Sequence, residues 1–152
     1  MSQPFVPADF EVPLTYEGPG FHLEPLGPVH NERDHAAWMP SIDHIKSTPG
    51  MDWTSWPIPM SVEDNMKDME LFAGEFANRE SFVYSILDGD TVIGCVYIER
   101  QAEGYKDDDY DAVARSWVAE SRSEMDSIVW EALNAWLASD WPFDKFYYAS
   151  RA

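Results

Sequence analysis

Residues 111–137 read DAVARSWVAESRSEMDSIVWEALNAWL, and this stretch decides the fold. Residues 112–120 are rich in strand formers and residues 123–139 carry apolar side chains at helical intervals, so a strand is predicted to lead directly into a long helix. The first turn of a helix leaves backbone N–H groups unpaired, which suits it to hold an anion. This turn contains Glu124 and Asp126 and no glycine, so its carboxylates oppose the anion site that its backbone offers.

The elements around this junction are indicated by periodicity and turn signals. Asp88-Gly89-Asp90 predicts a hairpin between two strands, and Ser61 has the capping-box spacing to Asp64 at the start of a helix. The other expected elements are strands at 21–26, 81–87, 91–100 and 143–149 and helices at 29–39 and 41–46. This order predicts one α/β (α+β) domain over residues 21–152, preceded by an extended, proline-rich segment over residues 1–20.

The chain is strongly acidic, with a formal net charge of −18 over 152 residues. Such a surface repels nucleic acids and anionic membranes, and it favours cationic or amine partners. The sequence shows neither a secretory signal pattern nor an apolar stretch of about 20 residues, which predicts a cytoplasmic protein that does not enter a membrane. Cys95 is the single cysteine and lies in an apolar run, so we expect a buried thiol and no internal disulfide.

The order of the predicted elements resembles that of the GNAT-type N-acetyltransferases. The resemblance is carried by V-I-G-C-V-Y-I at 92–98, R-S-W-V-A-E-S-R at 115–122 and the helix up to W-P-F-D-K-F-Y-Y at 141–148. It implies a mixed, mostly antiparallel central sheet flanked by helices. It also implies that the chain transfers an acyl group from acetyl-CoA, as co-substrate, to an amine of unknown identity.

The resemblance further implies where acetyl-CoA would bind. The cleft would lie between the strand that ends at Glu120 and the strand that starts at Phe143. The pantetheine arm would pair with the backbone near Val118 and Ala119, and the pyrophosphate would bind at the helix start, residues 123–127.

The family's pyrophosphate motif, Gln/Arg-x-x-Gly-x-Gly/Ala, is matched only in part. Arg122 matches the first position, Met125 replaces the first glycine, and Ser127 stands where a small residue belongs. The cofactor-binding residues implied in this way are Val118, Ala119, Arg122, Ser123, Met125, Asp126 and Ser127. Ser123 and Asp126 also fit a helix capping box, which gives the turn a purely structural interpretation.

Transfer to an amine needs a base that removes a proton, and Glu99 and Glu120 lie at the ends of predicted strands, where they suit that role. The family often uses a tyrosine as the acid for the departing thiolate, which the resemblance assigns to Tyr147 or the tyrosine next to it. Trp53 and Trp56 lie in a proline-rich loop, in a region that often covers the acceptor site in the family. We therefore expect both tryptophans to hold a cationic amine by cation–π contact.

The same sequence bears on three further questions: metal binding, oligomeric state and whether the chain is an enzyme. His30 and His35 are five residues apart and do not form the i, i+4 pair of a metal-binding helix, so we expect no metal site. The short last strand would leave an open sheet edge, where a second copy could pair in a homodimer. The rival to an N-acetyltransferase is a non-catalytic relative that binds a small molecule or a protein partner.

Overall fold

The computed structural model describes residues 4–52, 54–102 and 109–151. The strands are β1 (Tyr16–Gly18), β2 (Phe21–Pro25), β3 (Phe82–Asp88), β4 (Thr91–Glu99), β5 (Ala112–Val118) and β6 (Phe146–Tyr148). The helices are α1 (Asn31–Trp38), α2 (Ile42–Lys46), α3 (Val62–Ala77) and α4 (Met125–Asp140), with 3-10 turns at Pro28–His30, Met39–Ser41 and Glu120–Arg122.

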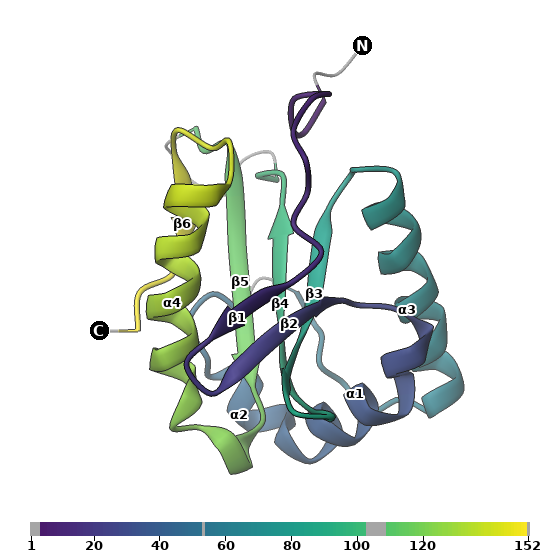
Figure 1. Cartoon of the computed structure of the whole chain (residues 1–152). Helices are drawn as coiled ribbons and strands as arrows, with labels where there is room; N and C mark the ends of the chain where they lie inside the picture. Colours follow the sequence, from purple (N-terminus) through teal and green to yellow (C-terminus); the bar gives the residue numbers. More distant parts are fainter. Residues whose placement is uncertain (1–3, 53, 103–108, 152) are drawn as a thin grey trace.

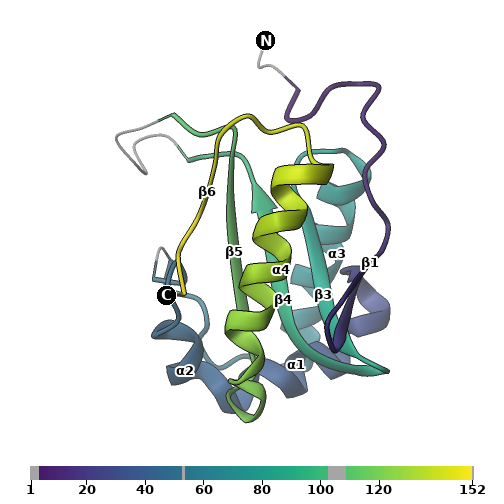
Figure 2. The same cartoon turned by 60° about the vertical axis from the view of Figure 1, so that its left-hand side comes forward.

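The strands form one sheet in sequence order, from β1 to β6. Neighbouring strands are antiparallel except β5 and β6, which are parallel, so the expected mixed, mostly antiparallel sheet is confirmed. The β5–β6 pairing joins only Ala112–Ala114 to Phe146–Tyr148. Beyond these residues the two strands diverge, as Figure 2 shows.

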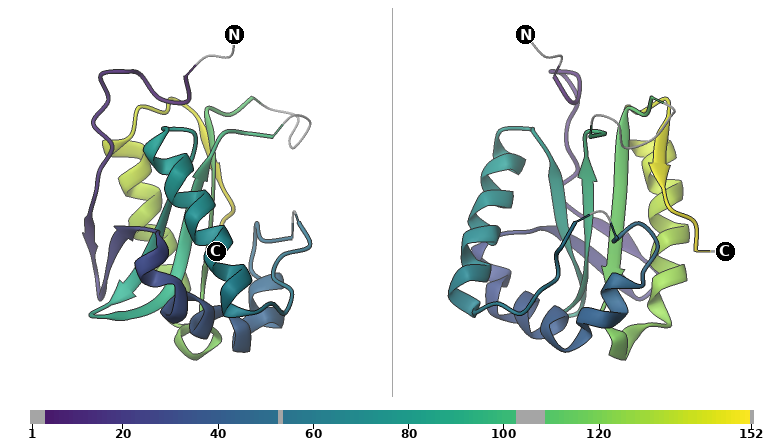
Figure 3. Two further views of the ribbon diagram at one scale, coloured as in Figure 1. Left: turned by 90° about the vertical axis from the view of Figure 1, so that its right-hand side faces the viewer. Right: turned by 180° about the vertical axis from the view of Figure 1, so that it is seen from behind.

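Helices cover both faces of the sheet. Figure 1 shows the sheet between α4 and α3, and Figure 2 shows α4 in front of the strands with α3 behind them. The side and rear views in Figure 3 place α1 and α2 on the same side as α3. Each face therefore has its own apolar cluster, around Leu133 of α4 on one side and around Trp38 of α1 on the other.

Gly94 is required where β4 meets the end of β5. It lies opposite Val118, and a Cβ at this position would overlap the Trp117 carbonyl oxygen. Beside it, the Ala119 N–H donates to the Ile93 carbonyl oxygen at 2.8 Å. This close approach of two backbones, which only glycine permits, fixes the direction in which the chain leaves β5.

The N-terminal segment packs against the rest of the domain. The Phe5 ring stacks on Phe143 with centroids 5.5 Å apart, and Arg79 donates to the Pro7 carbonyl oxygen at 2.7 Å. β1, a strand that the sequence did not predict, pairs with β2. Within the described residues, the segment contributes Phe5 and Val6 to the apolar cluster under α4.

Several element boundaries differ from the expected ones for local reasons. α1 begins at Asn31 because Pro28–His30 forms a 3-10 turn, and α4 begins at Met125 because Glu120–Arg122 forms another. The predicted cap of α3 is confirmed, since the Ser61 hydroxyl accepts from the Asp64 N–H at 3.1 Å.

Candidate functional site

The strongest candidate for a binding site is a pocket of about 300 Å³ between α1, α3 and β4. Its lining includes four carboxyl residues and three aromatic residues: Asp34, Asp68, Glu75, Glu99, Trp56, Phe72 and Tyr97. Among the residues that the structure describes, no lysine, arginine or histidine lines it. We call this site the acidic pocket. Carboxylates between aromatic walls are suited to an organic cation.

Asp34 lines the acidic pocket and is held by a hydrogen-bonded network. Only 3% of its surface is exposed, and its carboxylate accepts from Asn65 Nδ2 at 3.1 Å. The Asn65 amide oxygen in turn accepts from Trp38 Nε1 at 3.2 Å. Burial raises the pKa of Asp34 to about 6, although the hydrogen bond from Asn65 works against this shift.

Glu99 ends β4 and faces the same pocket. Its carboxylate accepts from the buried Arg115 guanidinium at 3.2 Å across the β4–β5 pairing. Burial still raises the pKa of Glu99, with the Arg115 charge opposing the shift. The pKa of Asp68 is raised as well, mainly by burial. A carboxyl group of this kind can take up a proton more readily than an exposed glutamate.

Trp56 lines the acidic pocket, and its predicted role in holding an amine stays a prediction. Its ring lies 5.3 Å from Trp38 and 6.0 Å from Trp117, measured between centroids. The Trp117 indole N–H donates to the Tyr97 hydroxyl at 3.0 Å. The three tryptophans are therefore linked to Tyr97, which also lines the acidic pocket. The structure therefore brings Trp56 and Glu99 together. Trp53, predicted for the same role, lies outside the described residues.

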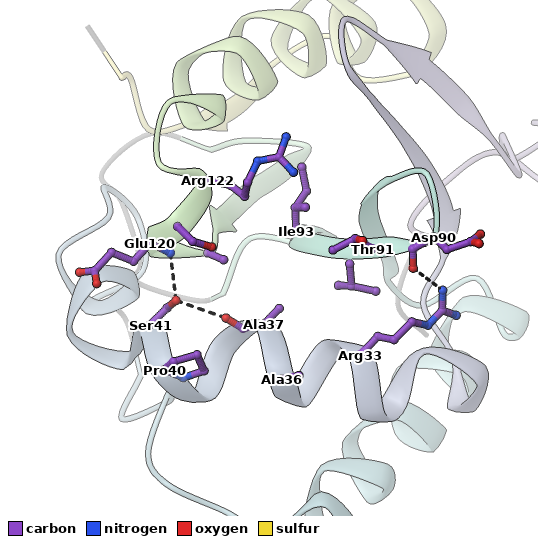
Figure 4. A pocket seen from close by; sticks show the side chains of 13 residues that line it. Arg33, Ala36, Ala37, Pro40, Ser41, Asp90, Thr91, Ile93, Glu120 and Arg122 are labelled. Atoms are coloured by element: carbon purple, nitrogen blue, oxygen red, sulfur yellow. Dashed lines mark hydrogen bonds between the residues drawn. The ribbon is translucent and has the colours of Figure 1, made fainter.

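Glu120 and Arg122 lie elsewhere, in a second pocket of about 470 Å³ between α1, the start of β4 and the β5–α4 junction (Figure 4). This second pocket, which we call the hairpin groove, shares no lining residue with the acidic pocket. The Glu120 N–H donates to Ser41 Oγ at 2.9 Å, while its exposed carboxylate points away from the groove. Arg122 pairs with Asp88 at 3.0 Å. The two predicted bases, Glu99 and Glu120, are thus in different pockets.

The start of α4 differs from the expected capping box. Glu124 is the N-cap residue and no side chain caps the helix, so the prediction of a Ser123–Asp126 box was wrong. Met125 is buried in the apolar cluster under α4, so its side chain does not cover the helix start. Ser123 and Ser127 are exposed there.

Arg151 fills the space where β5 and β6 diverge. Its side chain is 3% exposed, and its guanidinium donates to Asp126 Oδ2 at 2.8 Å, the Ser116 carbonyl oxygen at 2.7 Å and the Ala149 carbonyl oxygen at 2.7 Å. We call the place where these residues meet the β5–β6 fork. Asp126 pairs with Arg151 and does not cap α4, because a buried guanidinium requires a counter-charge.

Acetyl-CoA does not fit the residues of the β5–β6 fork as they stand. Val118 and Ala119, expected to pair with pantetheine, are buried, and the Ala119 N–H is already bonded to β4. The fork is filled by Arg151, and the Asp126 carboxylate on the first turn of α4 would repel a pyrophosphate.

The two neighbouring tyrosines of β6 point to opposite faces of the sheet. Tyr148 enters the fork, where its hydroxyl lies 2.5 Å from Ser116 Oγ and burial raises its pKa to about 12. The Tyr147 ring instead packs on Tyr110 at 5.5 Å. Alternation along the strand therefore makes Tyr148 the tyrosine of the fork, and a catalytic role for Tyr147 stays a prediction.

Sequence reasoning missed Asp34 and Arg151. The burial of Asp34 could have been predicted from the sequence. It lies three residues before Ala37 and four before Trp38, which places all three on the buried face of α1. The contacts of Arg151 could not have been predicted in this way, because Asp126 and Ser116 are 25 and 35 residues away along the chain.

The described residues contain no group of three histidine, cysteine or acidic side chains placed to share a metal ion. Within that part of the chain, no helix has the length and apolar character needed to cross a bilayer. Cys95 is buried, as predicted, and burial raises its pKa well above the ordinary range.

Comparison with solved structures shows the fold of GNAT-type acetyltransferases. The ribosomal-protein-S5-alanine acetyltransferase from Vibrio fischeri superposes with a TM-score of 0.54 and 11% identity, over 83% of this chain and 66% of that one. The microcin C7 self-immunity acetyltransferase MccE, solved with acetyl-CoA and AMP, gives a TM-score of 0.56 and 16% identity, over 78% of this chain and 61% of that one. This chain therefore spans less than two thirds of the length of either structure. No protein-family model and no curated protein sequence matches it.

Proposed function

From the fold that this chain shares with GNAT-type acetyltransferases, we propose that it is an N-acyltransferase whose acceptor is a small cationic amine bound in the acidic pocket. The observation that carries the proposal is the lining of that pocket, where the described charged groups are all carboxylates. An ammonium group would pair with them, and Trp56 would add a cation–π contact. Acetyl-CoA would supply the acyl group.

An amine must lose a proton before it can attack, and the acidic pocket contains groups that can accept one. Glu99 is our choice for the base, because its carboxyl group is buried, held by Arg115 and raised in pKa. Asp34 keeps a second carboxyl nearby, fixed in orientation by Asn65. Together they would hold the amine and take its proton.

A non-catalytic amine-binding protein of the same fold is the second candidate. The observation that favours it is the guanidinium of Arg151 in the β5–β6 fork, where the fold would place a co-substrate. A homodimer and a cytoplasmic location remain predictions from the sequence.

The test is acyl transfer from acetyl-CoA to butylamine, 1,4-diaminobutane and phenethylamine, followed through the released thiol. We expect turnover with at least one amine, and a loss of about 100-fold or more in kcat for Glu99→Gln. Glu70→Gln, on the exposed side of α3, is the matched control and should behave as wild type. Amine binding without turnover in any variant would favour the non-catalytic candidate. A loss of kcat in Glu120→Gln and not in Glu99→Gln would show that the base is Glu120, in the hairpin groove.

A further inference from the structure

The acidic pocket extends along α3, which forms one of its walls from Asn65 to Glu75. An α-helix rises about 1.5 Å per residue, so these two positions are roughly 15 Å apart along the helix axis. In Figure 3, α3 lies along one face of the sheet. The Asp34 carboxylate accepts from Asn65 at 3.1 Å, which places it beside the first end of this wall. A long, straight wall of this kind suits a linear ligand.

The four carboxyl groups that line the pocket form two pairs. Burial raises the pKa of Asp34, and the charge of Asp68 adds to this shift, so these two groups lie close together. Burial also raises the pKa of Glu99, and the charge of Glu75 adds to the shift, so they form a second close pair. Asp68 and Glu75 are two helical turns apart on α3, which separates the pairs by roughly 10 Å.

Apolar side chains line the stretch between the two pairs. Phe72 lies one turn after Asp68 and one turn before Glu75, and its ring packs on Tyr97 with centroids 6.0 Å apart. Met69 also lines the pocket. Methylene groups gain free energy on entering such a stretch, whereas a charged group there would lose its hydration without a partner. The pocket is therefore acidic at both ends and apolar in the middle.

A single ammonium group cannot neutralise both ends. Glu99 pairs with Arg115 at 3.2 Å, and Glu75 accepts from Ser81 Oγ at 2.9 Å, but the described lining contributes no basic side chain. An ammonium group bound at one end would leave the repulsion within the other pair unchanged. A molecule with a cation at each end reduces the repulsion in both pairs.

We propose that the ligand of the acidic pocket is a linear aliphatic diamine, with one ammonium group at the Glu75–Glu99 pair and the other at the Asp34–Asp68 pair. The proposal rests on the proposed function and names its substrate class, because the amine at Glu99 is the one that would react. An extended chain advances about 1.2 Å per bond, so the two nitrogens of 1,5-diaminopentane are about 7 Å apart. With each nitrogen about 3 Å from its carboxylates, this length fits pairs that are roughly 10 Å apart.

The experiment is a calorimetric titration of the full chain with 1,5-diaminopentane and with 5-amino-1-pentanol, at pH 7.5 and constant ionic strength. The alcohol has the same chain length and one ammonium group, and its other end is neutral. The second ammonium group should raise the affinity of wild type about tenfold or more. Equal affinity for the two compounds, or no binding of the diamine at millimolar concentration, would overturn the proposal.

The double variant Asp34→Asn/Asp68→Asn removes both charges of one pair and keeps the shapes of the side chains. The ratio of the two affinities should fall to about one in this variant, because the second ammonium group has no carboxylate to meet. Asp68→Asn alone, at a half-buried position, should lower the ratio about threefold. An unchanged ratio in these variants would place the second ammonium group elsewhere and refute the proposal.

The matched control is Glu63→Gln/Glu70→Gln, which removes the same charge from exposed positions of α3 and should keep the wild-type ratio. It is needed because the chain has a formal net charge of −18, so its field attracts any dication. An equal fall of the ratio in both double variants would show this general attraction and refute a diamine site.

The outcomes separate this proposal from the proposed function. Acyl transfer to butylamine with the same kcat/KM as to 1,5-diaminopentane would refute the diamine preference and leave the N-acyltransferase standing. Selective binding of the diamine without turnover of any amine would support the diamine site and refute the N-acyltransferase.

Discussion

Replacement of Asp34 by asparagine should remove a pH-dependent cost from the folded state. Asparagine keeps the shape of the side chain and an oxygen that can accept from Asn65, which now donates to Asp34 at 3.1 Å. Burial raises the pKa of Asp34 from 3.8 to about 6. A shift of about two pKa units corresponds to about 3 kcal/mol between the charged and neutral forms.

The sign is set by proton linkage. Below pH 4 the Asp34 carboxyl is protonated in both the folded and the unfolded chain, so its full contribution to stability is present. Between pH 4 and 6 the folded chain keeps a proton that the unfolded chain has released, so the free energy of unfolding falls as pH rises. The contribution is lost above pH 6, where the buried carboxylate is charged. Asp34→Asn lacks this change at every pH.

The assay is urea unfolding of wild type and Asp34→Asn at pH 4 and pH 8. The stability difference between the two proteins should change by about 3 kcal/mol in favour of the variant at pH 8. Any constant effect of the amide group cancels in this comparison. Asp43→Asn, at an exposed position of α2, should show no such change. A pH-independent difference for Asp34→Asn would refute the account of a buried carboxyl with a raised pKa.

Three further predictions concern packing and recognition. Gly94→Ala should destabilise the fold by about 2 kcal/mol or more in urea, because its Cβ would overlap the Trp117 carbonyl oxygen; wild-type stability would contradict this. Trp56→Ala should weaken butylamine binding about tenfold in calorimetry, because the cation–π contact is lost. Unchanged affinity would show that Trp56 does not contact the amine. Butylamine affinity of wild type should rise between pH 5 and pH 7 as Asp34 ionises, and a falling affinity would place the amine elsewhere.

The fold was largely predictable because its signals are local. The Asp88-Gly89-Asp90 turn, the Ser61 cap and the helical periodicity of residues 123–139 each act within a few residues, and each placed an element correctly. The start of α4 was predicted two residues early, and β1 was not predicted. The 3-10 turn at Glu120–Arg122 and the pairing of β1 with β2 depend on contacts that no short window contains.

The site was only partly predictable because pockets are tertiary features. Glu99 and Trp56, far apart in sequence, both line the acidic pocket, and their roles toward an amine stay predictions. Glu120, predicted as a base from its place at a strand end, lines the hairpin groove, and its role stays a prediction as well. Nothing near Arg151 in the sequence indicates that it binds Asp126 and Ser116.

The most direct test of the central claim is to map where butylamine binds, by its effect on the backbone and indole N–H resonances of the labelled chain. We predict saturable shifts at Tyr97, Glu99 and the Trp56 indole at pH 7.5, and no such shifts with butanol, which has the same chain length and no charge. Shifts confined to the residues of the hairpin groove, or equal shifts with butanol, would contradict a cation site in the acidic pocket.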